Sequence, residues 1–137
     1  MDNLLIVDIE TAPMRGVENY VTAGSPPKNY KNADTIQRWH ENALQHAISR
    51  AALDPDLCRI VAIGCTTPNG DVESDISATY EQEREMLTNF WRRVTSDTIL
   101  IGYNIVGFDM PVLLRRSLYL KLPNIPHYSL NKYRPSS

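Results

Sequence analysis

The stretch LLIVDIET, residues 4–11, constrains the fold more than any other part of the chain. Its four apolar residues run directly into Asp8 and Glu10, and a short apolar run with polar boundaries is typical of a buried strand. Side chains alternate between the two faces of a strand, so Asp8 and Glu10 are expected on one face, roughly 6–7 Å apart. An unpaired buried carboxylate is costly, so the pair predicts a cation, a hydrogen-bond network or contact with solvent. The two interpretations are a divalent metal site and a strand that ends at Ile9 with both acids solvated.

Composition predicts one globular domain. The chain has 137 residues, of which 42% are hydrophobic and 22% are charged, as in ordinary soluble proteins. No apolar run approaches the roughly 20 residues of a membrane span, and the N-terminus lacks the pattern of a signal peptide. We therefore expect a cytoplasmic protein with no membrane partner, in which Cys58 and Cys65 are reduced core residues.

The charges are unevenly distributed. The net charge is −2, yet no acid follows Asp109, whereas Arg115, Arg116, Lys121, Lys132 and Arg134 do. An acidic body with a basic end suits a cation site beside a surface that meets phosphate, but a short basic tail that is only solvated has the same pattern.

The rest of the chain alternates stretches of helix and strand type. Residues 12–31 are rich in Pro, Gly, Asn and Ser and predict a long surface loop beside the acids. The expected helices cover 34–53, capped by Asp34 and packed through Ile36, Trp39, Ala43, Ala47 and Ala51, then 79–94, capped by Thr79 with Met86, Leu87, Phe90, Trp91 and Val94 buried, and 110–122. The expected strands after the first cover 59–67, 72–77 and 98–103, with a turn at 68–71. This order predicts an α/β domain with a mixed sheet and flanking helices.

Two groups of charged side chains lie on the expected helices. Glu81, Glu83 and Glu85 are expected on the solvated face of their helix. Arg115 and Arg116 are either candidate phosphate contacts or exposed residues.

Asp109 follows the motif NIVGF, where the expected strand at 98–103 leads into a helix. On its own this position favours a helix N-cap, because Asp before Met110 and Pro111 is a good capping residue. A metal ligand is the alternative.

Taken together, DIET and NIVGFD resemble the first two motifs of the DEDD (DnaQ-like) 3'-5' exonucleases of the ribonuclease H-like fold. The segments AALDPDLCRIVAIG and IGYNIVGFDMPVLLRRS look like the branch related to the proofreading exonuclease of family B DNA polymerases. The resemblance covers nearly the whole chain, from Leu4 to about Arg134.

The resemblance implies a ribonuclease H-like mixed sheet and a two-metal phosphodiesterase. Asp8, Glu10 and Asp109 would hold two Mg²⁺ or Mn²⁺ ions, with Asp8 shared by both, Glu10 on the catalytic ion and Asp109 on the second. The backbone around Ile9 to Thr11 and the side chains of Asn104 and Phe108 would position the terminal nucleotide. Single-stranded DNA is the expected substrate, ahead of RNA.

The third motif of the family, Tyr or His followed four residues later by Asp, is not found, since Asn131 and Lys132 stand four residues after His127 and Tyr128. We therefore expect a single exonuclease-like domain over 1–137 that is C-terminally incomplete, with weak or no turnover alone and an apolar sheet face left open. The missing part would come from a longer chain or from another subunit. The alternatives are an inactive short form that binds nucleic acid or a partner, and a purely structural α/β domain.

Overall fold

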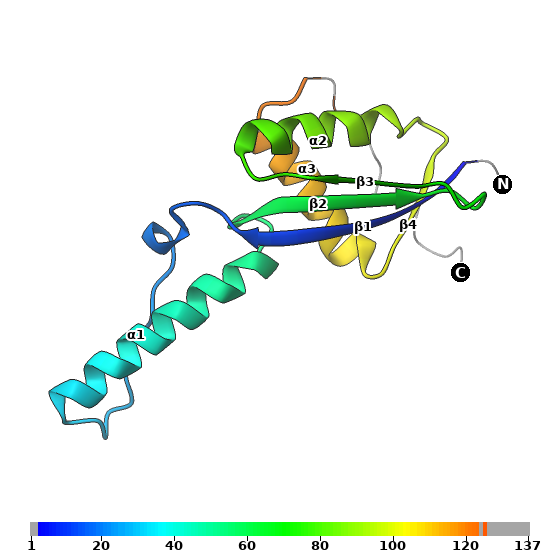
Figure 1. The fold of residues 1–137 in the computed structure, drawn as a ribbon. Helices are drawn as coiled ribbons and strands as arrows, with labels where there is room; N and C mark the ends of the chain where they lie inside the picture. The colour runs from blue at the N-terminus through cyan, green and yellow to red at the C-terminus, as the bar shows by residue number, and fades with distance from the viewer. Residues whose placement is uncertain (1–2, 124, 126–137) are drawn as a thin grey trace.

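In the computed structural model, which describes residues 3–123 and 125, the chain forms one mixed sheet with helices around it (Figure 1). The strands are β1 (Leu4–Pro13), β2 (Cys58–Thr66), β3 (Val72–Ile76) and β4 (Ile99–Ile101). The helices are α1 (Ala33–Arg50), α2 (Tyr80–Arg92) and α3 (Met110–Tyr119), with short 3-10 segments at Val17–Asn19 and Ala51–Leu53. The predicted α/β fold with a mixed sheet and flanking helices is confirmed.

The strand order is β3-β2-β1-β4, so β1 lies between two partners. It runs antiparallel to β2 and parallel to β4, and β2 and β3 form the predicted antiparallel hairpin. The sheet therefore builds outward from the strand that carries Asp8 and Glu10.

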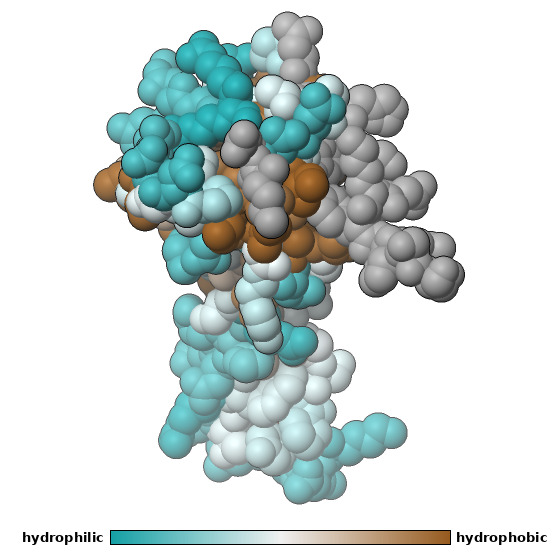
Figure 2. All heavy atoms as spheres, turned by 90° about the vertical axis from the view of Figure 1, so that its right-hand side faces the viewer, coloured by the Kyte–Doolittle hydropathy of each residue, from teal (hydrophilic) through white to brown (hydrophobic). Residues whose placement is uncertain are grey.

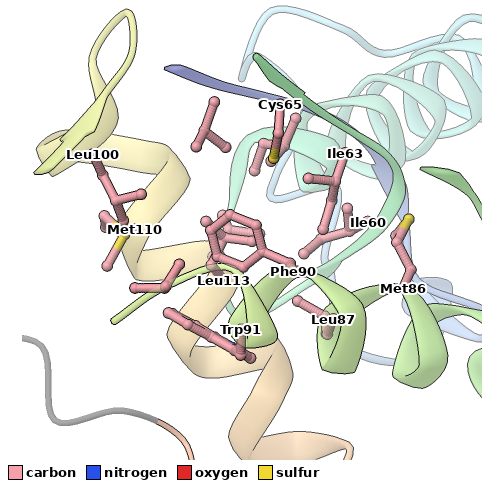
Figure 3. Packing of buried hydrophobic residues seen from close by; sticks show 14 of the residues in the cluster. Ile60, Ile63, Cys65, Met86, Leu87, Phe90, Trp91, Leu100, Met110 and Leu113 are labelled. Atoms are coloured by element: carbon pink, nitrogen blue, oxygen red, sulfur yellow. The ribbon is translucent and has the colours of Figure 1, made fainter. Parts of the chain in front are cut away.

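One face of the sheet carries the core (Figure 3). Leu5, Val7 and Ile9 of β1 point to this face, and the predicted buried side of α2 packs onto it. The cluster is completed by α3 and β2 residues, including Met110, Val112, Leu113, Ile60 and Ile63. Cys58 and Cys65 are buried and free, as expected, and burial raises the pKa of the Cys58 thiol to about 11.

The opposite face of the sheet carries Asp8, Glu10 and a row of exposed apolar side chains. Ile6 is paired with Ile101 on one side and with Thr66 on the other, and Thr66 is paired with Val72. Ile6, Ile101 and Val72 are 41%, 42% and 74% exposed. Figure 2 shows apolar residues gathered between the hydrophilic upper surface and α1. We call the side of the sheet that carries these residues the bare face.

Helix α1 extends away from the sheet (Figure 1), and none of its side chains is buried. The residues of the predicted packed face that lie within α1 are therefore half-buried, and only Ala51, directly after the helix, is buried. The N-cap is Asn32 and not Asp34, since the Asn32 side chain accepts hydrogen bonds from the Asp34 and Thr35 backbone N–H groups at 2.8 and 3.4 Å. The predicted N-cap was wrong because Asp and Asn have equal propensity for this position, so the sequence does not distinguish Asp34 from Asn32.

Helix α2 begins as predicted, with the Thr79 hydroxyl accepting from the Gln82 N–H at 3.1 Å. The prediction that Glu83 is solvated is wrong, because this carboxylate is 1% exposed and pairs with Arg116. No helix in the described part of the chain is both long and apolar enough to cross a membrane.

Candidate active site

Asp8 and Glu10 lie within β1 and not at its end. The strand continues to Pro13 because Ala12 and Pro13 still pair with β2. Both acids are exposed on the bare face, while Val7 and Ile9 between and beside them are buried. The predicted shared face is confirmed, and the position of the strand end is corrected.

The pairing of β1 with β2 changes register directly after Glu10. Glu10 pairs with Ala62 and Thr11 with Ile60, so Val61 is an extra residue on β2. A bulge of this kind bends a strand and increases its twist. Beyond it the Thr11 hydroxyl donates to the Ala52 carbonyl oxygen at 2.6 Å, which fixes the end of β1 to the segment that follows α1.

Asp109 lies between β4 and α3. It closes a single π-helical turn, Ile105–Asp109, and α3 begins at the next residue. Its side chain makes no capping hydrogen bond, so the N-cap interpretation is wrong, because the π-turn gives Asp109 helical backbone angles. π-turns inside helices occur frequently at functional sites.

The environment of the Asp109 carboxyl includes the charges of Asp8 and Glu10. Asp109 is only 6% exposed, and burial raises the pKa of its carboxyl to about 6, assisted by the negative charges of Asp8 and then Glu10. A hydrogen bond to its own backbone opposes this shift. The charges of two carboxylates from the middle of β1 therefore act on one carboxyl that directly precedes α3.

These carboxylates suit a hard divalent cation by their chemistry, since Mg²⁺ and Mn²⁺ prefer carboxylate oxygens. A cation would offset the repulsion that raises the pKa of Asp109. As they stand, no three Asp, Glu, His or Cys side chains among the described residues are gathered closely enough to hold one ion. Asp8 and Glu10 are solvent-exposed, so their carboxylates have room to turn.

The four residues predicted to contact substrate have different surroundings. The Ile9 side chain is in the core, so only its backbone can face a ligand, and the Thr11 hydroxyl is engaged with Ala52. Phe108 is half-buried and packs against the core cluster, while Asn104 is exposed with a left-handed backbone at φ 49°. The structure thus brings Asn104 to the surface beside the turn that carries Asp109.

Two glycines that were not predicted as functional shape this turn. A β-carbon on Gly107 would clash with the Asn104 side chain, and one on Gly102 would lie 2.7 Å from the Val7 carbonyl oxygen. The glycine within NIVGFD was the available signal, because only glycine permits so close an approach.

The model of the family described as "DNA polymerase family B, exonuclease domain" matches residues 50–136. The chain belongs to this family. The membership implies a 3'-5' exonuclease kind of domain. The matched segment contains Asn104, Phe108 and Asp109 but not β1, which carries Asp8 and Glu10.

Two proteins similar to this family B exonuclease domain are much longer than it. A 50-residue stretch is 48% identical to the DNA polymerase delta catalytic subunit of Glycine max, covering 34% of this chain and 4% of that protein. The structure of the family B DNA polymerase from the archaeon Pyrobaculum calidifontis aligns over 90% of this chain and 12% of that chain, with 18% identity and a TM-score of 0.43. The chain therefore spans a small fraction of either polymerase.

The predicted phosphate contacts of this exonuclease domain need one correction. Arg116 is 5% exposed and engaged with Glu83, so it does not face a substrate. Its helical neighbour Arg115 is exposed and pairs with Asp56 at 3.0 Å. His127, Tyr128, Lys132 and Arg134 lie outside the described residues.

Proposed function

We propose that this domain is a metal-dependent 3'-5' exonuclease that shortens single-stranded DNA from its 3' end by a two-metal mechanism. The family membership supports the exonuclease activity, and the DNA polymerases among the similar proteins favour DNA over RNA. The observation that carries the proposal is that Asp8 and Glu10 share one face of β1 and that their charges help to raise the pKa of the buried Asp109.

Asp8, Glu10 and Asp109 would hold two Mg²⁺ or Mn²⁺ ions, with Asp8 shared, Glu10 on the first ion and Asp109 on the second. Such ions, when bound, supply an activated hydroxide at neutral pH and relieve charge on the leaving 3' oxygen. Asp109 has to give up its proton before it can act as a ligand. With a pKa of about 6 it is mostly ionised at pH 7 and mostly protonated below pH 5.

Asn104 and the backbone of residues 9–11 would orient the terminal nucleotide. Asn104 is exposed next to the π-turn, so its amide can donate to and accept from a sugar or phosphate group. The half-buried ring of Phe108 would offer an edge to the terminal sugar or base. Contacts of this kind are tolerant of sequence, so little base preference is expected.

The alternative is a module that binds nucleic acid or a partner protein without cleaving it. Neighbouring carboxylates repel a phosphate backbone unless cations neutralise them. A binding module that keeps these acids would therefore bind DNA only when Mg²⁺ or Mn²⁺ is present.

A 5'-labelled single strand incubated with Mg²⁺ or Mn²⁺ tests the proposal, using this chain and a form extended beyond Ser137. We expect a ladder of shortened products from the extended form, weak or no products from the present chain, and loss of the ladder in Asp8→Ala. Glu81→Gln, on the exposed side of α2, is the matched control and should leave the ladder intact. Metal-dependent binding without shortening would favour the binding module, and a ladder that survives Asp8→Ala would contradict the assigned site.

A further inference from the structure

We propose that Arg116 and Glu83 are positioning residues that hold Asp109 at a fixed place relative to Asp8 and Glu10. The inference rests on the proposed function, since it assigns the buried ion pair a role in forming the same cation site.

The contact between the two side chains is bidentate and buried. Arg116 Nε donates to Glu83 Oε2 and Arg116 Nη2 donates to Glu83 Oε1, both at 2.8 Å. Arg116 is 5% exposed and Glu83 is 1% exposed. Two parallel charge-assisted bonds define the orientation of both groups as well as their distance. The Arg116 guanidinium also lies 5.6 Å from the centre of the Tyr80 ring, which further restricts it.

Glu83 connects this pair to the sheet. Its Oε2 atom accepts a second hydrogen bond, from the backbone N–H of Ile60 at 2.9 Å. Ile60 pairs with Thr11, which is the first residue after the register shift that follows Glu10. The carboxylate of Glu83 is thereby attached to the part of β2 that sets where the end of β1 lies.

Arg116 connects the pair to Asp109. The two residues are seven positions apart; Asp109 is buried directly before α3, and Arg116 is on the buried side of that helix with Val112 and Leu113. Seven residues are about two helical turns, or roughly 10 Å along the axis. The contact of Arg116 with Glu83 therefore constrains where α3 lies against the sheet, and with it the backbone position of Asp109 directly before the helix.

A buried ion pair is weak evidence for added stability, because desolvation offsets most of the attraction between the charges. What the pair supplies here is a single permitted orientation of the Arg116 and Glu83 side chains, and so of α3 relative to α2. Asp8 and Glu10 belong to β1 and Asp109 directly precedes α3, so their relative placement depends on how α3 is held against the sheet.

The neighbouring residue provides a matched control. Arg115 is on the same helix and also bonds a carboxylate, Asp56, at 3.0 Å, but this pair is exposed and ties α3 only to the loop before β2. Exposed pairs of this kind contribute little. Breaking it removes an arginine–carboxylate contact from α3 without touching the buried connection to β2.

The test compares the full chain with Glu83→Gln/Arg116→Met and with Arg115→Gln. The double variant keeps an acceptor for the Ile60 N–H and leaves no unpaired buried charge, so it is expected to fold. Hydrogen exchange of the α3 amides is measured without metal, and Mn²⁺ affinity is measured separately by titration. We expect exchange in α3 to be about tenfold faster and Mn²⁺ affinity about tenfold lower in the double variant, with Arg115→Gln unchanged in both.

If the double variant keeps the affinity of the original chain for Mn²⁺, or the same exchange rates in α3, the pair does not position Asp109. A chain that binds no Mn²⁺ before any substitution would contradict the proposed function instead, and the exchange rates would still show whether the pair holds α3. Should the double variant fail to fold, Arg116→Lys carries the same comparison, because it retains the charge but not the bidentate geometry. The Mn²⁺ affinity of Arg116→Lys should lie between that of the original chain and the tenfold lower value expected for the double variant.

Discussion

Gly102 leaves no room for a side chain against Val7. A β-carbon at position 102 would lie 2.7 Å from the Val7 carbonyl oxygen and 3.4 Å from Ile105, and Val7 immediately precedes Asp8. Gly102→Ala must therefore displace the backbone of β1 or the turn after β4. We expect unfolding free energy to fall by about 1–3 kcal/mol in urea titrations, as in other overpacked sites.

Gly64 is the matched control for this substitution. It lies across from Asp8 in β2, and a β-carbon there would meet the Asp8 carbonyl oxygen at 3.9 Å, an ordinary contact. Gly64→Ala should leave stability unchanged or raise it by about 0.5–1 kcal/mol, because alanine restricts the unfolded chain. Equal losses at both positions would show that the close approach to Val7 is not the cause.

The raised pKa of Asp109 predicts a stability that depends on pH. The carboxyl titrates near 6 in the folded chain, against 3.8 ordinarily, so the folded chain binds the proton more tightly. This contribution to stability is fully present below about pH 4 and is lost as the pH rises through 6. In metal-free buffer, Asp109→Asn should remove this part of the pH dependence and stabilise the chain at pH 7 by on the order of 2–3 kcal/mol.

The same titration tests whether the three acids converge. Asp8 raises the pKa of Asp109 through its charge, so Asp8→Asn should lower that pKa without removing the larger effect of burial. Carboxyl carbon shifts of Asp109, followed by NMR between pH 3 and 8, measure this directly. An unchanged midpoint in Asp8→Asn would mean that the two carboxylates are too far apart to share a cation.

The caps of α1 and α2 should differ in what they stabilise. Thr79 caps a helix that packs on the core, so Thr79→Ala should lower unfolding free energy by about 1 kcal/mol. Asn32 caps a helix with no buried side chain, so Asn32→Ala should reduce the helical circular dichroism signal while the urea midpoint stays the same. Equal shifts of the midpoint would indicate that α1 unfolds together with the sheet.

The bare face should govern self-association. Val72 and Ile76 are 74% and 83% exposed on β3, so Val72→Thr/Ile76→Thr retains β-branched residues while lowering apolar exposure. We expect less binding of a hydrophobic dye and less sedimentation in high salt, with stability nearly unchanged. Ile63→Thr, on the buried side of the same hairpin, should be strongly destabilising and serves as the contrast.

Local patterns predicted the elements and the candidate acids. The alternation around Asp8 and Glu10 assigned their common face, and the spacing from Met86 to Val94 identified the packed side of α2, because both signals come from residues near in sequence. The shared face of a strand follows from its geometry alone.

Long-range partners account for what the sequence did not predict. Glu83 stands between Glu81 and Glu85, and its burial depends on Arg116, which is 33 residues away. Asp109 resembles a helix cap until the π-turn before it is known. The apolar spacing of α1 indicated a packed helix, yet whether an apolar face finds a partner is decided by the placement of other elements.

Because α1 extends away from the sheet, the chain could be cut within this helix without removing any strand from the sheet. β1 precedes this helix and β2 follows it, and the two strands pair along almost their whole length. A chain cut within α1 would be two fragments of which the first contributes a complete central strand to the second. The domain is therefore suited to fragment complementation. One fragment would carry Asp8 and Glu10, and the other would carry Asp109.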